Sequence, residues 1–433
     1  MRVMKTLSRF LVTTAVAAAV WATAPVPAHA APPPAGTCPN PEPAQAVITE
    51  QPWAQKMLDP ETVWQHSTGA GVLVAVVDSG VDSDHPQLGG DKVLPGEDFY
   101  LVGDLPGNFD CASHGTAVAG IIGANPADGV GFAGLAPGAR ILPVRVAERD
   151  TDDNGTSQGL DVGLLASGIR YAADQGAKVI NLSLSGRVDD PGVREAVAHA
   201  RSKDALVVAA VGNMGQQDLP GGPTYPSAYD GVLGVGAVDM AGQRLAESQV
   251  GPQVDLVAPG GSVASASRAA GHQYWKGSSF AAPFVAASAA LVRAAWPALS
   301  ADEVAERLKA TATPAPGGRD STSYGAGLVN PYRAVTDELT SVAPAAMPMV
   351  APAPVDPEQA RLASWWDSAG QGGRLLAVGA GAGALLGAAG VVVLSRGRRS
   401  GWRARRAAPV AATREIEEPP DQVFLLPPPS SER

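Results

Sequence analysis

The sequence predicts an α/β domain built on a doubly wound, mostly parallel sheet. Short continuous apolar runs are typical of strands buried on both faces of such a sheet. They occur at 71–78, 141–146, 178–184, 205–211, 231–238 and 254–258. Apolar residues at helical spacing alternate with these runs, at 116–122, 159–175 and 193–202. Strands that alternate with helices form βαβ units, and such sheets bind ligands at the carboxyl ends of their strands.

Two more helices complete the predicted domain, which comprises residues 61–338. Residues 280–296 form a long Ala-rich stretch, which suits the centre of the domain because small side chains allow close packing. Residues 301–311 predict a further helix, with Ser300 as its N-cap.

Composition narrows the functional classes. The 433-residue chain carries a formal net charge of −10, and aromatic residues make up 5% of it, which argues against a nucleic-acid partner. Its two cysteines, Cys38 and Cys111, belong to no CxxC or Cys/His cluster, so no zinc site is predicted. The acidic stretch at 150–154 is expected to be a solvated loop. We therefore predict no metal and no cofactor.

The N-terminal part has the features of an exported protein. Residues 1–30 predict a signal peptide, because basic residues precede an apolar run and a small-residue cleavage site. The alternative is an uncleaved anchor. Residues 31–60 are rich in Pro and Ala and predict an extension that lies on the main domain. Export places the chain in an oxidising compartment, so we predict a disulfide between Cys38 and Cys111 that pins this extension.

The C-terminal part predicts a membrane anchor. Residues 339–370 form a Pro/Ala-rich linker, and 371–395 contain roughly 20 uncharged residues, enough to cross a bilayer as a transmembrane helix. Six arginines follow between 396 and 406. By the positive-inside rule, the tail at 396–433 lies in the cytoplasm and the large domain lies outside. The alternative is a buried Gly/Ala helix, which these flanks disfavour.

Ser279 is the candidate nucleophile. It lies at the start of the 280–296 helix, where backbone N–H groups and the helix dipole favour developing negative charge. Gly277, two residues earlier, allows a tight turn and the approach of a substrate. A serine before an Ala-rich helix is more often only an N-cap. The assignment therefore requires a base and an orienting carboxylate elsewhere in the chain.

His114 is the candidate base among six histidines. Gly115 beside it leaves room for the imidazole in a cleft, and a helix of small residues follows. Without these neighbours a histidine at a helix start would be a capping residue. The other histidines lie in the signal (His29), the extension (His66), a turn (His85), a polar helix face (His199) and a loop (His272).

Asp78 and Asn213 follow two of the buried runs and supply the remaining chemistry. A carboxylate must fix the tautomer of the base and offset its charge, and Asp78 fits because it ends a buried strand. Asp82 is the rival, but it lies past the turn, where we expect it to be solvated. Asn213 can donate its side-chain amide to a tetrahedral oxyanion, with the backbone N–H of Ser279 as the second donor. Its alternative is a simple loop turn.

The order Asp, His, Asn, Ser on strand ends and helix starts resembles the subtilisin family of serine peptidases over residues 60–335. The resemblance implies a subtilisin-like fold and serine endopeptidase activity. The implied roles are orienting carboxylate for Asp78, general base for His114, nucleophile for Ser279 and oxyanion donor for Asn213. Gly277, Ala281 and Pro283 match the family register at the nucleophile, which excludes Ser278.

The chain departs from the family pattern at a few positions. Thr and Met usually flank the nucleophile, where this chain has Ser278 and Phe280. The family also binds extended peptides by adding a strand beside an edge segment, which 181–186 matches. The residues implied to bind substrate are Ser183, Leu184 and Ser185. The family usually has glycine in place of Ser185, which implies a narrower first specificity pocket.

The order of segments narrows the resemblance. A signal peptide, a cysteine-bearing extension, a subtilisin-like domain, a Pro-rich linker and one membrane span together resemble the mycosins, the membrane-anchored proteases of type VII secretion systems. This implies a single-pass cell-membrane protein with an extracytoplasmic catalytic domain. The implied partners are an exported protein or peptide substrate, the membrane and the secretion machinery. The alternative function is a structural component of the secretion complex, with proteolysis incidental.

Overall fold

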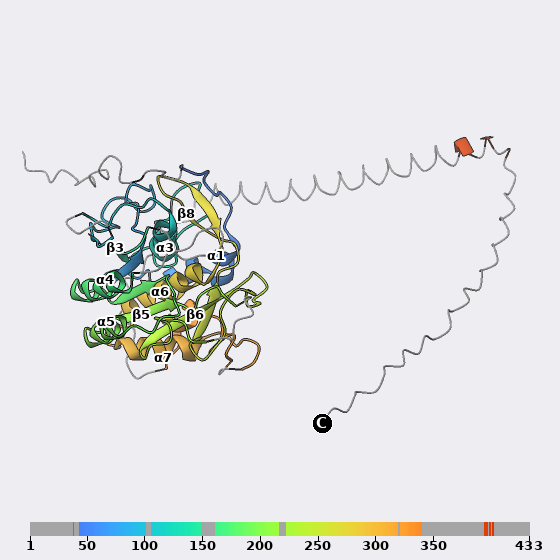
Figure 1. Ribbon diagram of the computed structural model, residues 1–433. Coiled ribbons are helices and arrows are strands. Elements are labelled where there is room, and N and C mark those ends of the chain that lie inside the picture. The colour runs from blue at the N-terminus through green and yellow to red at the C-terminus, as the bar shows by residue number, and fades with distance from the viewer. Residues whose placement is uncertain are drawn as a thin grey trace, which may run out of the picture. The chain divides into compact units, whose positions relative to one another are not determined.

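The computed structural model describes residue 38 and the ranges 43–100, 105–148, 161–215, 222–318 and 321–339, together with 394–396, 398–399 and 401. Contacts divide the chain into two units, Met1–Pro348 and Met349–Arg433, and the first contains the folded domain of Figure 1. The predicted signal peptide, the acidic stretch at 150–154, the linker beyond 339, nearly all of the membrane span and most of the tail lie outside the described residues.

Seven strands form one sheet in the order β2-β3-β1-β4-β5-β6-β7, and every pairing is parallel. This confirms the predicted fold class. Strand β1 lies between β3 and β4, so the chain winds to both sides of it. The strands are β1 (Leu73–Asp78), β2 (Glu97–Asp98), β3 (Arg140–Arg145), β4 (Val179–Leu182), β5 (Leu206–Ala210), β6 (Val232–Val238) and β7 (Leu256–Pro259).

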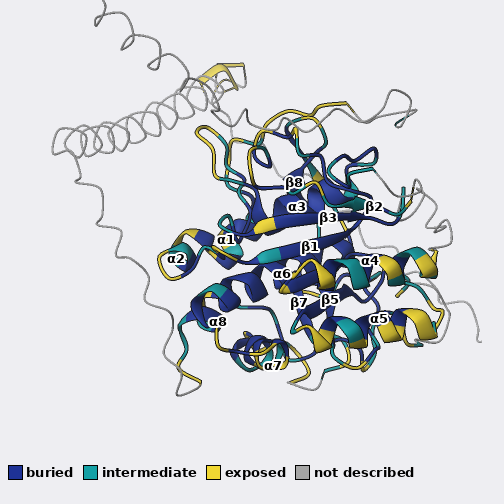
Figure 2. Ribbon diagram, turned by 90° about the vertical axis from the view of Figure 1, so that its left-hand side faces the viewer, coloured by how far each residue is buried: buried dark blue, intermediate teal, exposed yellow. Residues whose placement is uncertain are grey.

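Two layers of helices cover the sheet, as its burial on both faces requires. Helices α3 (His114–Gly123) and α6 (Ser278–Ala295) pack on the face that Val74 and Val76 present. Helices α4 (Val162–Asp174) and α5 (Pro191–Ser202) pack on the opposite face. In Figure 2 the strands and α6 are mostly dark blue, whereas yellow residues lie on the outer sides of α4 and α5.

Helix α6 is the core of the domain. Among the described residues it is the one helix long and apolar enough to cross a membrane, but 94% of it is buried inside the domain. The helix is therefore a core element. Six of its alanines are completely buried, and their small side chains let the helix lie close to the sheet. The predicted helix at 280–296 thus exists, with its first turn two residues earlier.

The remaining helices lie at the ends of the chain's folded part. Helix α7 (Ala301–Thr311) has the predicted bounds, and Ser300 caps it through a capping box with Glu303. Helix α8 (Pro331–Thr336) follows. The sequence did not indicate α1 (Trp53–Leu58) and α2 (Pro60–Trp64), because helices of six and five residues are too short to show a period.

An antiparallel hairpin, β8 (Val263–Ala266) and β9 (His272–Trp275), also escaped prediction, because four-residue strands give little periodicity. His272, expected in a loop, lies on β9. The N-terminal extension runs along this hairpin. Gln45 N donates to Ala270 O at 2.9 Å, and His272 N donates to Ala46 O at 3.0 Å. The extension therefore lies on the main domain, as predicted.

The predicted disulfide joins Cys38 to Cys111. Cys111 is 7% exposed and lies in the loop before α3. The bond closes a sequence separation of 73 residues, which by the chain-entropy argument stabilises the fold by about 4 kcal/mol. The extension is thus tied to the domain covalently, as well as through its hydrogen bonds to the hairpin.

Acidification should weaken the attachment of the extension through His272. Its Nδ1 accepts from Ile48 N at 3.1 Å, and its Nε2 lies 2.6 Å from Gln87 Oε1, so the ring is neutral in the native state. Burial lowers the pKa of His272 from 6.5 to about 4. Between these two values the unfolded chain binds a proton that the folded chain does not, so stability falls as the pH falls through that window.

We predict that the melting temperature of His272→Gln changes less between pH 7 and about pH 4.5 than that of the wild type. Some acid sensitivity remains, because burial also lowers the pKa of His85. The control is His66→Gln, at an exposed position, which should keep the wild-type pH dependence. Equal pH dependence in wild type and His272→Gln would contradict the prediction.

Candidate active site

Asp78 is the last residue of β1 and lies at the carboxyl edge of the sheet. It is 1% exposed, and its Oδ1 accepts from Ser79 N at 2.7 Å. The same oxygen lies 2.7 Å from His114 Nδ1. A carboxylate in this place holds the proton of the imidazole on Nδ1, which leaves Nε2 as an acceptor.

His114 is the first residue of α3, and its side chain is 13% exposed. The next residue has to be glycine. A Cβ on Gly115 would lie 2.0 Å from the carbonyl oxygen of Gly80 and 3.1 Å from Asp78 Oδ1. Only a residue without a side chain lets α3 begin this close to the end of β1. The glycine that the sequence analysis noted thus permits the contact between His114 and Asp78.

Ser279 lies in the first turn of α6 and is 7% exposed. Gly277 precedes the helix with a φ of 125°, which favours glycine. The ring of Phe280 lies 5.0 Å from that of His114, centroid to centroid, and stacks on Trp275 at the same distance. The structure therefore brings the bonded pair of Asp78 and His114 beside the helix start that carries Ser279.

Asn213 reaches the same helix start from the end of β5. Its Oδ1 accepts from Ser278 N at 2.8 Å and from Ser278 Oγ at 3.0 Å. These two bonds fix the orientation of the amide, so that Nδ2 is the group left to donate. Asn213 is exposed, and its Nδ2 lies 2.8 Å from the position of a Cβ on Gly277. The donor therefore lies next to the N-terminus of α6.

Ser278 has a role that the sequence did not indicate. It is fully buried, and its hydroxyl accepts from Gly212 N at 3.0 Å while donating to Asn213. The hydroxyl thus joins the end of β5 to the start of α6 and is not open to a substrate. The signal that could have found it is the resemblance itself, since the family has another hydroxyl residue, Thr, at this position.

The three residues expected to bind substrate follow β4 directly. Ser183 is fully buried, and its hydroxyl donates to Ser279 O at 2.6 Å. Leu184 is 2% exposed and packs in the core with α4 and α5. Their side chains support the domain, so a substrate can contact only their backbone. Ser185 is half-buried, and its Oγ lies 2.9 Å from the position of a Cβ on Gly212.

The expectation that Asp82 is solvated is wrong. Asp82 is 7% exposed, and its Oδ2 accepts from Ala269 N at 2.6 Å. The turn between β8 and β9 covers it, and this hairpin was not predicted. Its other oxygen accepts from Asp84 N at 3.0 Å. The carboxylate thus supports a loop, whereas Asp78 contacts His114.

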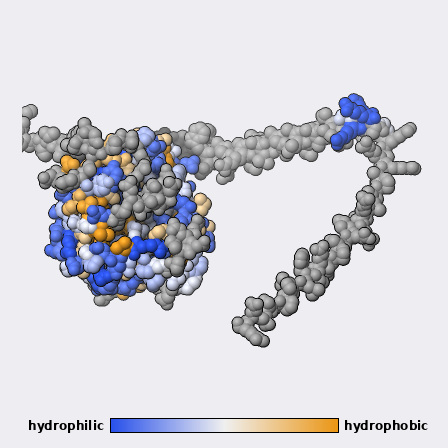
Figure 3. All heavy atoms as spheres, viewed as in Figure 1, coloured by the Kyte–Doolittle hydropathy of each residue, from blue (hydrophilic) through white to orange (hydrophobic). Residues whose placement is uncertain are grey.

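A small apolar hollow of about 190 Å³ adjoins the substrate segment at Ser185 and Gly186. Val162, Leu165 and Val193 line it, from α4 and α5. Figure 3 shows hydrophobic residues gathered near α4 on an otherwise largely hydrophilic face. Within the described ranges, no group of three or more His, Cys, Asp or Glu side chains is arranged to hold a metal ion.

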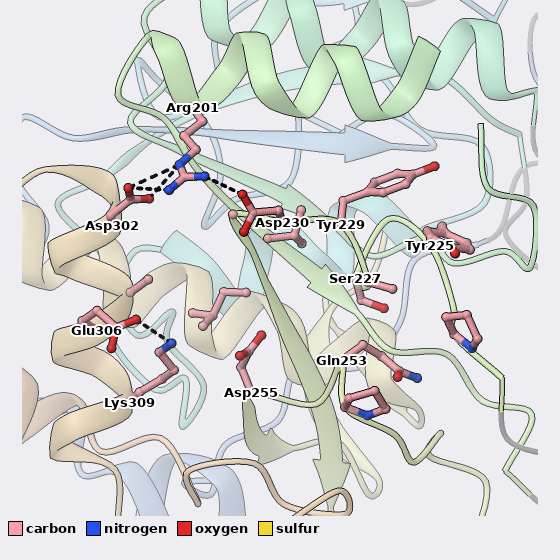
Figure 4. Close-up of a pocket in the computed structure, with 17 residues that line it drawn as sticks. Arg201, Tyr225, Ser227, Tyr229, Asp230, Gln253, Asp255, Asp302, Glu306 and Lys309 are labelled. Atoms are coloured by element: carbon pink, nitrogen blue, oxygen red, sulfur yellow. Dashed lines mark hydrogen bonds and ion pairs between the residues drawn. The ribbon is translucent and has the colours of Figure 1, made fainter. Parts of the chain in front are cut away.

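A larger hollow of about 690 Å³ lies elsewhere, where β6 begins beside α7. Figure 4 shows most of its charged side chains paired with one another, whereas Asp255 has no dashed contact to another of the side chains drawn. Arg201 contacts Asp302 at 2.8 Å and Asp230 at 2.9 Å, and Lys309 contacts Glu306 at 2.7 Å. None of the candidate catalytic residues lines it, so it is separate from the site at the carboxyl edge of the sheet.

Comparisons with known proteins show which family the chain is similar to. The model of the subtilase family (Peptidase S8) matches residues 69–327. Thermitase from Thermoactinomyces vulgaris is 38% identical over 281 residues, which cover 65% of this chain and 94% of the relative. Mycosin-4 from Mycobacterium tuberculosis is 37% identical over 336 residues, which cover 69% of this chain and 72% of the relative.

The chain is also similar to solved structures of mycosin proteases. The crystal structure of MycP1 with its N-terminal propeptide removed has a TM-score of 0.59 and 33% identity, covering 67% of this chain and 99% of that one. The MycP3 protease from the type VII (ESX-3) secretion system has a TM-score of 0.57 and 33% identity, covering 67% of this chain and 91% of that one. This chain therefore belongs to the subtilase family, and it is a subtilisin-like serine protease of the mycosin type.

Proposed function

We propose that Asp78, His114 and Ser279 are the catalytic triad of this protease and that Asn213 supplies the oxyanion donor. The observation that carries the proposal is the 2.7 Å contact between His114 Nδ1 and Asp78 Oδ1, beside the first turn of α6. This contact presents Nε2 of the imidazole as the base that a serine hydroxyl needs.

In the first half of the reaction, Ser279 Oγ attacks the carbonyl carbon of a peptide bond while His114 Nε2 takes its proton. The imidazolium that forms is held by Asp78. The carbonyl oxygen becomes an oxyanion, which accepts hydrogen bonds from Asn213 Nδ2 and the backbone N–H of Ser279. The dipole of the 18-residue helix α6 points its positive end at the same place.

In the second half, His114 returns the proton to the leaving amine, so the peptide bond breaks and an acyl-enzyme remains. Water then attacks the ester while His114 Nε2 takes its proton. The ester C–O bond breaks, His114 returns the proton to Ser279 Oγ, and the carboxylic acid product leaves. The substrate lies in extended form along the backbone of Ser183–Ser185, beside the first turn of α6. Ser185, in the position of the family's usual glycine, narrows the first specificity pocket.

Ser279 should react with an active-site-directed fluorophosphonate, because only an activated hydroxyl displaces its leaving group. We expect mass spectrometry of the labelled full-length protein to place the adduct on Ser279. His114→Ala should reduce the labelling rate by at least about 100-fold, since the base is lost. An adduct on another residue, or no adduct in a folded sample, would contradict the triad.

Ser278 should affect turnover through Asn213. Ser278→Ala removes one of the two hydrogen bonds that fix the amide of Asn213. We expect kcat to fall roughly tenfold while KM changes less than about twofold, because the only substrate group that the Asn213 N–H contacts is the oxyanion. Ser278→Thr keeps the hydroxyl and should retain activity. If the two variants lose activity equally, the hydroxyl does not position Asn213.

The same proposal includes a location. The sequence of 371–395, followed by arginines, supports a single membrane span with the protease domain outside the cytoplasmic membrane. In this proposal the signal peptide is 1–30 and directs export. It is followed by the extension at 31–60, the peptidase domain at 61–338 and the linker at 339–370. The relatives named mycosin, and the MycP3 protease named for a type VII secretion system, support a role in that export route with exported proteins as substrates.

Topology can be tested with two tags in intact cells. A tag after Arg433 should resist external protease and become digestible after permeabilisation, because the arginine-rich tail lies in the cytoplasm. A tag in the exposed turn at Ala241 should be digested without permeabilisation. Digestion of the C-terminal tag in intact cells would contradict the proposed orientation.

The alternative is that the protein acts as a structural part of the secretion complex. It draws its support from the resemblance and from a relative described as an essential component of the type VII (ESX-1) secretion system. No contact or surface within the described part of the chain adds to it, whereas the site geometry supports peptidase chemistry directly.

A further inference from the structure

Asp110 is a buried carboxylate in the loop between β2 and α3. It is 1% exposed and precedes the disulfide cysteine Cys111. Both carboxylate oxygens accept two hydrogen bonds each, all from neutral groups. The donors are Ala112 N (2.9 Å) and Ser79 Oγ (3.1 Å) to Oδ1, and Thr116 N (2.9 Å) and Thr116 Oγ1 (2.7 Å) to Oδ2.

Three of these donors come from the strand end that carries Asp78 and the helix that carries His114, and the fourth, Ala112 N, lies in the loop before α3. Ser79 directly follows Asp78 at the end of β1, and Thr116 lies two residues after His114 in α3. Ser79 Oγ also accepts from Gly115 N at 3.0 Å. One carboxylate therefore connects the strand end to the first turn of the helix.

A disulfide and two arginine side chains fix the segments that form this hydrogen-bond network. Cys111 is bonded to Cys38, and Arg268 Nε donates to the backbone carbonyl of Asp110 at 2.9 Å. The fully buried Arg145 also donates from Nε to Ser79 O at 3.0 Å. Because the residues of this network are themselves held in place, the network can keep neighbouring reacting groups within a fraction of an ångström of their positions.

The network requires Asp110 in its ionised form. Four donors occupy the four lone-pair positions of the carboxylate, so a protonated oxygen or an amide N–H at this place would face another donor. Burial raises the pKa of Asp110 to about 6, and the nearby charge of Asp78 acts in the same direction, whereas the hydrogen bonds from Thr116 and Ala112 oppose it.

We propose that Asp110 is a positioning residue for the protease reaction, which aligns His114 Nδ1 on Asp78 Oδ1 by tying Ser79 to Thr116. Asp110 does not contact the substrate in this role. The inference rests on the proposed catalytic function of Asp78 and His114. Misalignment of a base costs rate without weakening substrate binding, so the effect is in kcat.

The test uses a matched pair of variants in the full-length protein. Thr116→Val keeps the shape of the side chain and removes the hydroxyl donor, whereas Thr116→Ser keeps the donor. Turnover of a peptide substrate is normalised to the amount of Ser279 that a fluorophosphonate labels. We expect Thr116→Val to lower kcat roughly tenfold with KM within about twofold, and Thr116→Ser to stay within about twofold of wild type.

The pH dependence of kcat/KM distinguishes a role of Asp110 in positioning His114 from a role only in the stability of the fold. A misaligned Asp78 stabilises the imidazolium less, so the acid limb of kcat/KM should move to lower pH in Thr116→Val. Asp110→Asn should lower kcat further, by about 100-fold, because its amide N–H faces a donor. The inference would be overturned if Thr116→Val changed only the melting temperature. In that case its kcat per labelled Ser279 and the acid limb of its kcat/KM profile would equal those of the wild type.

The control is labelling of the wild type. If Ser279 in folded wild-type protein does not react, the proposed function fails, and the inference that rests on it fails too. If Ser279 reacts and Thr116→Val turns over like the wild type, the inference alone is overturned.

Discussion

The close approach of the end of β1 to the start of α3 is the constraint on which the rest of the site depends. A Cβ at Gly115 would meet the Gly80 carbonyl at 2.0 Å, so a side chain at position 115 would push the two elements apart. The close approach brings His114 Nδ1 to 2.7 Å from Asp78 Oδ1. Since N–H···O hydrogen bonds have donor–acceptor distances of about 2.7–3.2 Å, a small displacement of either element would separate His114 from Asp78.

Helix α6 carries the other half of the chemistry, and the ends of two neighbouring strands hold its first turn. Ser183, after β4, donates to the carbonyl of Ser279, and Asn213, after β5, accepts from Ser278. Parallel strands end at one edge of the sheet, so these contacts converge on a single place. The proposed nucleophile, base and oxyanion donor are therefore positioned by strand ends that all belong to one sheet.

The N-terminal extension contributes residues to the core of the folded domain, which its Pro- and Ala-rich composition did not predict. Ala54 and Leu58 of α1 are buried in the same core as α3 and α6. The disulfide from Cys38 reaches the loop that carries Asp110, next to the bonded pair of Asp78 and His114. Helix α1 spans fewer than two turns, so no period could emerge in a Pro- and Ala-rich stretch.

The sequence by itself determined six of the seven strands of the sheet, the long helices and the candidate catalytic groups at Asp78, His114 and Ser279, because apolar runs and adjacent glycines are local signals. The two-residue strand β2 is too short to give such a signal. The sequence also determined the disulfide, since only two cysteines exist. Only the tertiary structure decided that Asp82 is buried and that Ser183, Ser278 and Asp110 hold the site. These roles depend on partners far along the chain, such as Ala269 for Asp82 and Ser279 for Ser183, 187 and 96 positions away, and no local pattern encodes such contacts.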